Sequence, residues 1–203
     1  MDKFFLQLEP VCAKTLKLDH MDGRIAASRH QPEKKEMIRP FDDEKAFSLV
    51  GKELGVSRWI PIEQTRIADF AVNTDDPDPA HIDPQWAEQH SPYGTTIAFG
   101  FLTISLLTTM VNEIIARPVD EVSTLNYGFD RLRLLSPVRV GRRIRGRFVL
   151  KELTLRSSTQ FRAVYGVTVE IEGEDKPALV ADWLVVVNVR NARSQVNLTA
   201  VTS

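Results

Sequence analysis

The sequence predicts an α+β fold in which a strongly curved antiparallel sheet wraps one long apolar helix. The first observation behind this is the apolar stretch IAFGFLTISLLTTMV at residues 97–111. The second is a row of four strand candidates that fill most of the chain after it. In one of these candidates apolar residues recur at every second position, which is the period of a strand with one buried face.

The apolar stretch predicts a buried helix from roughly Phe99 to Ala116. It is shorter than the roughly 20 residues that a membrane-spanning helix needs, so we expect it in a protein core. Because the segment is hydrophobic almost all round, other parts of the protein must cover it on most sides. The strand candidates that follow would supply this cover.

These candidates span residues 123–134, 142–156, 159–173 and 177–189. Strands of this length joined by short turns pair as antiparallel neighbours, so we expect one antiparallel sheet. The third candidate has the clearest alternation, with apolar side chains at Phe161, Ala163, Tyr165, Val167, Val169 and Ile171.

Shorter elements are expected before the long helix. The segment SRWIPI at 57–62 predicts a short strand, and EQTRIADFAVNT at 63–74 predicts a helix. A further short helix, PQWAEQH at 84–90, is expected to begin at Asp83. An aspartate followed by proline resembles an N-cap with proline at the first helical position.

The segment between these two helices, DDPDPAHIDP at residues 75–84, places a histidine five positions after an aspartate. Proline disfavours the helical conformation for the residue before it, so Asp76 and Asp78 are expected in extended or turn conformations. We therefore interpret the segment as a rigid loop rather than a helix. Such a loop could aim the Asp76 carboxylate and the His81 imidazole at one spot.

Length and composition favour one domain with an extension. The chain has 203 residues, of which 43% are hydrophobic, and this is enough for one sizeable core. We expect an N-terminal extension at 1–50, a globular domain at 51–190 and a C-terminal tail at 191–203. The formal net charge of -1 gives no reason to expect a nucleic-acid partner.

The expected location is the cytoplasm. Cys12 is the only cysteine, which excludes an internal disulfide and fits a reducing compartment. The apolar cluster near the start is interrupted by Gln7, Glu9 and Pro10, so it lacks the unbroken apolar region of a signal peptide. No membrane association is expected.

Residues 70–107 resemble the hydratase motif of the MaoC-like, (R)-specific enoyl-CoA hydratase family, including its nodulation-protein-N-like branch. The resemblance extends from about residue 59 to 189 and implies the hot-dog fold. Members of the family carry an Asp, a His five positions later, an Asp-Pro pair and a Gly that opens the central helix. In this sequence the matching residues are Asp76, His81, Asp83, Pro84 and Gly100.

The resemblance implies hydration of a trans-2-enoyl-CoA to a 3-hydroxyacyl-CoA, without a metal or an organic cofactor. Asp76 and His81 would hold and activate the attacking water, and an imidazole suits this because its unperturbed pKa lies near neutrality. The N–H of Gly100 at the helix N-terminus would stabilise the negative charge that develops on the thioester oxygen.

Further site residues follow from the same resemblance. Ser105 matches a helix serine that supports the loop in relatives, although it could instead bond back to its own helix. Phe99 replaces a histidine found in many relatives and is expected to line the pocket, and Asp78 replaces an asparagine. Other interpretations stay open, since Asp76 could be only a turn former, His81 an ordinary polar residue and Gly100 a close-packing position.

Partners follow in the same way. Between Arg131 and Arg147 there are seven arginines and no acidic residue, and this patch could meet the phosphates of coenzyme A or simply face solvent. A homodimer is expected from the resemblance. Two other functions stay open: an acyl-CoA thioesterase, which usually needs a carboxylate on the central helix, and an acyl-CoA-binding protein without hydratase activity.

Overall fold

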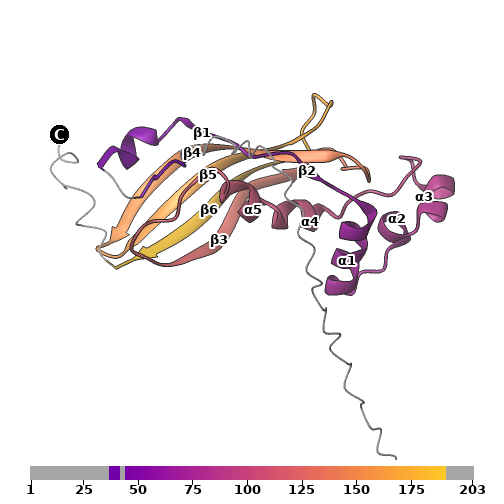
Figure 1. Ribbon diagram of the computed structural model, residues 1–203, viewed down its shortest axis with the longest axis horizontal. Helices are drawn as coiled ribbons and strands as arrows, with labels where there is room; N and C mark the ends of the chain where they lie inside the picture. Colours follow the sequence, from indigo (N-terminus) through magenta and orange to yellow (C-terminus); the bar gives the residue numbers. More distant parts are fainter. Residues whose placement is uncertain (1–36, 42–43, 191–203) are drawn as a thin grey trace, which may run out of the picture. The chain divides into compact units, whose positions relative to one another are not determined.

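The structure is a computed structural model that describes residues 37–41 and 44–190. Helical elements precede most of the sheet in the chain (Figure 1). The elements in order are η1 (Glu44–Leu49), β1 (Glu53–Val56), β2 (Ile60–Pro61), α1 (Gln64–Thr74), α2 (Pro79–Ile82), α3 (Pro84–His90), α4 (Gly100–Ser105), α5 (Leu107–Val111), β3 (Glu121–Leu134), β4 (Arg143–Ser157), β5 (Gln160–Ile171) and β6 (Leu179–Val189).

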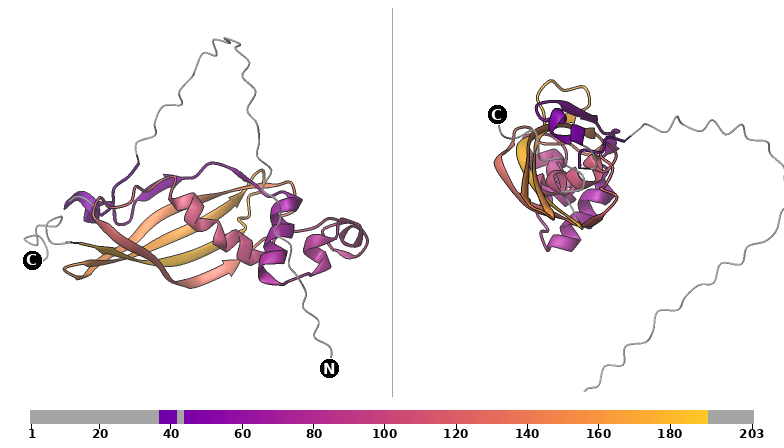
Figure 2. Two further views of the ribbon diagram at one scale, coloured as in Figure 1. Left: turned by 60° about the horizontal axis from the view of Figure 1, so that its bottom comes forward. Right: turned by 90° about the vertical axis from the view of Figure 1, so that its left-hand side faces the viewer.

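The sheet is antiparallel, with the strand order β1-β4-β5-β6-β3, and β2 also pairs with β4. Its strands curve around part of α4 and α5, as the end-on view in Figure 2 shows, while α1 to α3 gather at one end of the sheet (Figure 1). The four long strand candidates are confirmed, each with ends within two residues of the prediction. The α+β fold with a helix wrapped by a curved sheet is therefore confirmed.

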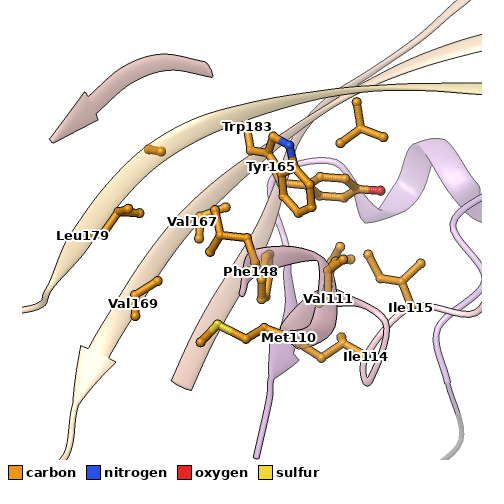
Figure 3. Close-up of a cluster of buried hydrophobic side chains, with 14 of the residues drawn as sticks. Met110, Val111, Ile114, Ile115, Phe148, Tyr165, Val167, Val169, Leu179 and Trp183 are labelled. Atoms are coloured by element: carbon orange, nitrogen blue, oxygen red, sulfur yellow. The ribbon is translucent and has the colours of Figure 1, made fainter. Parts of the chain in front are cut away.

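The core lies between the central helices and the concave face of the sheet. All six apolar residues of the alternating pattern in β5 are buried, because alternate side chains of a strand point to one face. Figure 3 shows Phe148 and Val167 on the strands facing Met110 and Val111 on the helix side. Met110 and Phe148 have no exposed surface at all.

The prediction of one helix from Phe99 to Ala116 is wrong at its C-terminal end. Two helices follow one another, with Leu106 between them, and the second ends at Val111. Beyond Val111 the backbone groups form hydrogen bonds with Ile38 instead. The Ile38 N–H donates to the Ile114 carbonyl at 3.0 Å, and the Ala116 N–H donates to the Ile38 carbonyl at 2.8 Å. These hydrogen bonds compete with those that would continue the helix.

The expectation that the central helix is covered on most sides is also only partly met. One face of α4 and α5 is exposed in the described part of the chain. Phe101 is 73% exposed on this face, and Ser105, Thr108 and Thr109 are exposed as well. The edge strand β3 likewise carries exposed apolar side chains, at Val122, Leu125 and Tyr127. The large exposed apolar residues of this region therefore occur on both the helix and the sheet edge.

The predicted extension at 1–50 lies mostly outside the described residues, as does the predicted tail at 191–203. Two described residues of the extension, Phe41 and Ala46, are buried in the core, and the Phe41 ring lies 5.8 Å from that of Phe161. Within the part of the chain that is described, the structure contains no helix with the length and apolar character needed to cross a membrane.

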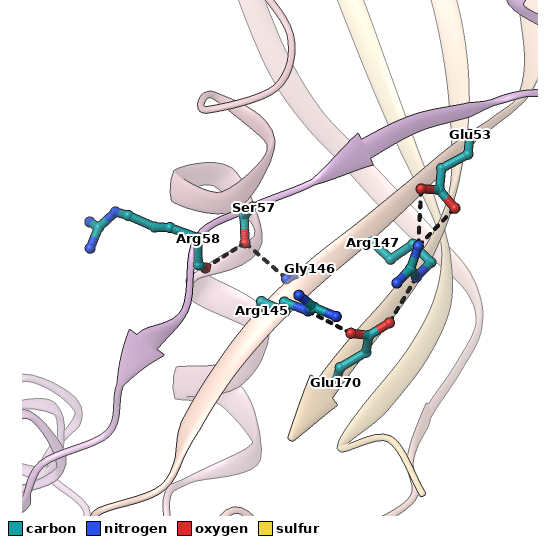
Figure 4. Close-up of polar contacts among 7 residues, drawn as sticks. All are labelled: Glu53, Ser57, Arg58, Arg145, Gly146, Arg147 and Glu170. Atoms are coloured by element: carbon teal, nitrogen blue, oxygen red, sulfur yellow. Dashed lines mark hydrogen bonds and ion pairs between the residues drawn. The ribbon is translucent and has the colours of Figure 1, made fainter. Parts of the chain in front are cut away.

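The outer face of the sheet carries an ion-pair network (Figure 4). Glu170 receives hydrogen bonds from Arg145 at 2.6 Å and Arg147 at 2.8 Å, and Arg147 also contacts Glu53 at 2.9 Å. Burial alone would raise the pKa of Glu170, but the hydrogen bonds from Arg147 and Arg145 outweigh it and lower that pKa below the usual range. The network ties β1, β4 and β5 together.

Candidate active site

The segment that carries Asp76 and His81 is not the extended loop that its prolines predicted. Helix α1 ends at Thr74, and its C-cap residue Asp75 adopts a left-handed conformation with φ 53°. Residues Pro79–Ile82 then form the single helical turn α2. The prediction failed because Pro79 occupies the first helical position, where its missing N–H is not needed. Asp78 caps the turn by accepting a hydrogen bond from the Ala80 N–H at 2.8 Å.

The next helix begins as predicted. The Asp83 carboxylate accepts hydrogen bonds from the N–H groups of Gln85 at 3.0 Å and Trp86 at 2.9 Å, and Pro84 takes the first helical position. Two successive aspartate caps therefore fix the turn between α1 and α3. His81 lies on α2, between these two caps.

His81 is half-buried, and its ring is oriented by two contacts. Its Nδ1 lies 2.7 Å from the carbonyl oxygen of Ile97, and its ring stacks on Phe99 with centroids 3.8 Å apart and a 32° tilt. A carbonyl oxygen only accepts hydrogen bonds, so Nδ1 must carry the proton in this contact. The neutral imidazole then has its lone pair on Nε2, which is the form of a general base.

Two polar residues that sequence reasoning missed hold the backbone of His81 in place through a chain of two hydrogen bonds. The Gln64 side chain donates to the His81 carbonyl at 2.8 Å and accepts a hydrogen bond from the Thr96 hydroxyl at 2.6 Å. Thr96 is completely buried. Neither residue stands out in the sequence, because the pairing joins positions far apart in the chain, and only the fold brings them together.

His81 and Gly100 line one cavity of about 350 Å³ at the N-terminal end of α4. The volume is within the range of small-molecule sites. Most of its remaining wall comes from the connection between β3 and β4 and from the segment before α4, including Tyr93, Ile97, Leu134, Ser136 and Val138.

Gly100 is held at this wall by its neighbours in the chain. The Ala98 N–H donates to the Val138 carbonyl at 2.7 Å, which fixes the backbone just before the helix. The first N–H groups of a helix have no acceptor within it, and the N-cap residue Phe99 provides no side-chain bond to them. A Cβ atom at Gly100 would lie 2.3 Å from Cδ1 of Leu134, so the glycine leaves room for that side chain.

Three other predicted site residues lie outside this cavity. Asp76 is exposed and lines a separate surface hollow together with Val72, Pro77 and Ile82, the residue that follows His81 in the chain. Phe99 is buried beneath the imidazole, where its ring also lies 5.3 Å from that of Phe70, so it supports His81 rather than facing the cavity.

Ser105 is exposed on the outer face of α4. Its hydroxyl donates to the Phe101 carbonyl at 2.8 Å, which is the back-bonded arrangement that the sequence left open as an alternative. The hydroxyl therefore has a partner within its own helix, and it does not reach the segment that carries His81 in this chain.

The arginines between Arg131 and Arg147 do not form one free basic patch. Arg131 pairs with Asp182, Arg143 with Glu172, and Arg145 and Arg147 with Glu170. Within residues 37–41 and 44–190, no ion pair involves the other three, Arg133, Arg139 and Arg142. Of these, Arg139 is linked to the site through its backbone, which forms a bridge with Ile97, the residue that holds the His81 ring.

Among residues 37–41 and 44–190, no group of three or more His, Cys, Asp or Glu side chains is placed to hold a metal ion. The arrangement instead offers a histidine base, a helix N-terminus and an apolar wall around one cavity. These are groups for proton transfer and for stabilising an oxyanion.

Comparison with known proteins gives matches of three kinds. Residues 45–171 match the family described as the MaoC like domain. Over 139 residues the chain is 48% identical to nodulation protein N of Rhizobium meliloti, which covers 68% of this chain and 86% of the relative. Over 138 residues it is 36% identical to 3-hydroxyacyl-thioester dehydratase Z of Mycobacterium tuberculosis, covering 68% and 90% respectively.

Among solved structures, the (R)-hydratase from A. caviae involved in PHA biosynthesis superimposes with a TM-score of 0.55. The superposition covers 67% of this chain and 94% of that one at 20% sequence identity. At this level of identity the similarity shows the fold, which is the α+β hot-dog fold.

Proposed function

The chain belongs to the MaoC-like domain family, and from this premise we propose that it is a hydratase that adds water to a trans-2-enoyl-CoA to give an (R)-3-hydroxyacyl-CoA. The reverse dehydration would use the same groups. A relative named 3-hydroxyacyl-thioester dehydratase supports a reaction of this class. The substrate and the roles of individual residues are part of the proposal.

The observation that carries the proposal is the orientation of His81. Its Nδ1 is bonded to the Ile97 carbonyl at 2.7 Å, so Nε2 is left to accept a proton in the cavity that Gly100 shares. We assign the attack to a water whose oxygen bonds to the β-carbon while His81 accepts one of its protons. The negative charge passes to the thioester oxygen, which the N–H of Gly100 would stabilise.

Asp76 would hold the same water by accepting a hydrogen bond from it, and the proton that His81 has taken would pass to the α-carbon, so that the net change is the addition of one water molecule. Asp76 is exposed and lines the other hollow, which also includes Ile82, the residue after His81. In this assignment the bound thioester and its water span the two hollows. The proposal therefore gives His81 and Asp76 one shared task.

A homodimer is part of the proposal. The exposed face of α4 and the edge strand β3 both carry large apolar side chains, including Phe101, Leu125 and Tyr127. An edge strand with unpaired backbone groups and exposed apolar residues favours pairing with another strand. Sedimentation velocity tests this: we expect a dimer for the protein and a monomer for Tyr127→Asp, and a monomeric parent protein would contradict the dimer.

Binding of the coenzyme A phosphates is assigned to the arginines that form no ion pair in the described chain, with Arg139 the best placed. We expect Arg139→Ala to raise KM for an enoyl-CoA while leaving KM unchanged for the matching enoyl-pantetheine, which has no nucleotide phosphates. An equal effect on both substrates would remove Arg139 from the phosphate site.

A thioesterase is less well supported. The central helices Gly100–Val111 contain no carboxylate, and the next one, Glu113, pairs with Arg58 at 2.7 Å. The remaining alternative is an acyl-CoA-binding protein without hydratase activity, and the hydration assay separates it from the enzyme.

The deciding experiment follows the loss of absorbance of the conjugated thioester with crotonyl-CoA and with longer trans-2-enoyl-CoAs. We expect turnover by the protein and a loss of at least about a hundredfold for His81→Ala and for Asp76→Asn, since general acid–base groups contribute about this much. The double variant should be little worse than the worse single one, because both groups act on one water.

His90→Ala is the matched control. This histidine is exposed on α3, its Nδ1 lies 2.9 Å from the Trp86 carbonyl, and it does not line the cavity. Its loss should leave turnover unchanged. Normal turnover by His81→Ala would overturn the assignment of the base, and acyl-CoA binding without turnover at any chain length would favour the binding protein.

A further inference from the structure

A second cavity lies at the C-terminal end of α5, and it is separate from the one at His81. It has a volume of about 130 Å³, and none of the residues that line it lines the cavity at His81. Its inner wall consists of buried side chains from the helix end and from the sheet, among them Val111, Ile115, Tyr165 and Val187. Figure 3 shows Val111 and Ile115 on the helix side of this cluster and Tyr165 on the strand side.

One part of the wall comes from a segment outside the matched family domain. Phe41 lines the cavity, whereas the family match begins at residue 45. The Phe41 side chain is 4% exposed, and its ring lies 5.8 Å from that of Phe161 on β5, so it is packed against the sheet. Residues 37–41, here called the closing segment, therefore add a wall that the matched domain itself does not supply.

Backbone hydrogen bonds fix the closing segment beside the cavity. The Ile38 N–H donates to the Ile114 carbonyl at 3.0 Å, and the Ile38 carbonyl accepts from the Ala116 N–H at 2.8 Å. These bonds form a parallel bridge between Ile38 and Ile115, which itself lines the cavity. Because Phe41 follows Ile38 by only three residues, the same bonds keep its ring at the cavity wall.

The open side of the cavity adjoins the exposed face of the central helices. Phe101, Ser105, Thr108 and Asn112 are all exposed, and their spacing of four, three and four residues places them along one helix face. Helical hydrogen bonds continue across the junction of α4 and α5, so this face is continuous. Thr108 and Asn112 line the cavity. Since Thr108 is eight residues beyond Gly100, about 12 Å along a helix axis, only a chain of sufficient length reaches the cavity from Gly100.

The cavity suits a small uncharged group. An apolar cavity of roughly 150 Å³ accepts a molecule of the size of benzene, so a volume of about 130 Å³ agrees with one ring or with the last few carbons of a chain. None of the buried residues that line it carries a charge, and a charged group placed among them would lose its hydration. An apolar chain end therefore fits this wall best.

We propose that Phe41 is a specificity-determining residue that closes the cavity at the end of α5 and so limits the length of the acyl chain whose far end enters it. This inference rests on the proposed function, since the chain is that of the thioester held at Gly100. A short acyl chain does not reach the cavity, and a long one meets the Phe41 ring. Removal of the ring extends the cavity and admits a longer chain.

The first test compares hydration of trans-2-enoyl-CoAs of increasing chain length by the full-length protein and by its variant Phe41→Ala. We expect the preferred length to increase in the variant, with kcat/KM for the longer chains rising about fourfold for each methylene group that gains an apolar environment. Crotonyl-CoA, which is too short to reach the cavity, should be hydrated equally well by both proteins. Phe41→Trp should shorten the preferred length. A length profile that is the same in all three proteins would overturn the proposal.

A binding experiment tests the wall without the hydration reaction. Benzene or naphthalene is added to the full-length protein, and a rise in Tm reports binding to the folded state. We expect benzene to raise the Tm of the parent protein and of Phe41→Ala, and naphthalene to raise only that of the variant, because the second ring needs the space that Phe41 occupies. A rise with naphthalene in the parent protein, or none in the variant, would contradict the role of Phe41 as the closing wall.

Two further variants separate this effect from a general loss of stability. Leu54 on β1 is 4% exposed, like Phe41, but does not line the cavity, so Leu54→Ala should lower Tm without a gain in naphthalene binding. The same gain in both alanine variants would overturn the proposal. Phe41→Leu removes fewer atoms, so it keeps the test available if Phe41→Ala does not fold, and it should show a smaller change in the same direction.

The two experiments also distinguish a failure of this inference from a failure of the proposed function. If no enoyl-CoA is hydrated, the proposed function is wrong, and naphthalene binding still decides whether Phe41 closes the cavity. If hydration is normal and the length profile is unchanged while naphthalene binds Phe41→Ala, the acyl chain does not enter the cavity and the proposal is wrong.

Discussion

The sheet with its central helices and the end formed by α1, α2 and α3 are stabilised in different ways. In the sheet, β5 buries every second side chain and is paired on both sides, with β4 and with β6. In the helical end, α2 buries no residue and α3 buries only Ala87. Helix α1 buries Ile67 and Ala71, and aspartate caps and single hydrogen bonds hold α2 and α3 beside it.

Because of this difference, the region on which stability mainly depends is not the region that carries the proposed catalytic base. The sheet provides most of the buried apolar area, on which the free energy of unfolding mainly depends. The residue proposed as the base is on the least buried helix, where a small displacement costs little stability and changes the geometry of the reaction. Substitutions in the sheet should therefore change mainly the free energy of unfolding, and substitutions in the helical end should change mainly kcat/KM.

The largest expected effect is in the sheet. Phe148→Ala removes a completely buried ring that faces Met110, and we expect it to lower the free energy of unfolding by about 3–5 kcal/mol. Urea unfolding measures this. Thr154→Ala on the same strand is exposed and serves as the control, with an expected change within about 0.5 kcal/mol. Equal effects of the two changes would show that the sheet core does not dominate stability.

A smaller effect is expected at Asp182, which pairs with Lys151 at 2.7 Å and with Arg131. Burial alone raises the pKa of this carboxyl, but the hydrogen bonds from Lys151 and Arg131 outweigh it and lower that pKa below 3.8. Its stabilisation is therefore present above pH 3.8 and is lost as the pH falls through the lower folded-state pKa.

Asp182→Asn should thus destabilise the protein by about 1–2 kcal/mol at pH 7. The difference from the parent protein should shrink as the pH falls through the lowered pKa of Asp182, because below it both proteins carry a neutral side chain at this position. Thermal unfolding across this range measures it. A difference that stays constant with pH would mean that the charge of Asp182 does not contribute.

The smallest expected effect on stability is at Asp78, in the helical end. Asp78→Ala removes the cap of α2 and should cost about 1 kcal/mol, whereas Asp78→Asn keeps a capping oxygen and should cost almost nothing. Since His81 lies on this turn, we expect a loss in kcat/KM of about fivefold for the alanine variant alone. If both variants lose activity equally, the charge of Asp78 matters more than its cap.

The sheet could be predicted from the sequence because its signal is local. The alternation from Phe161 to Ile171 reports one buried face directly, and the strand ends follow from the turns between them. The end of the central helix could not be predicted, since it is set by backbone hydrogen bonds with Ile38, a residue far away in the chain.

The candidate site, too, could be predicted only in part from the sequence. The spacing of Asp76 and His81 identified the segment, but prolines were taken to exclude a helix where Pro79 in fact begins one. Phe99 was expected at the pocket and lies beneath His81, and the support from Gln64 and Thr96 was not foreseen. Contacts of this kind depend on which segments the fold brings together.

The contact between Gly100 and Leu134 has a consequence for how the protein could evolve. A methyl group at Gly100 would meet the flexible end of Leu134, which is half exposed, so Leu134 can turn aside instead of the helix being displaced. Because Leu134 lines the cavity, a change at residue 100 would reshape the wall through its neighbour. Paired substitutions at positions 100 and 134 could then change the range of substrates during evolution while His81 is conserved. The order in which the two substitutions occurred would matter.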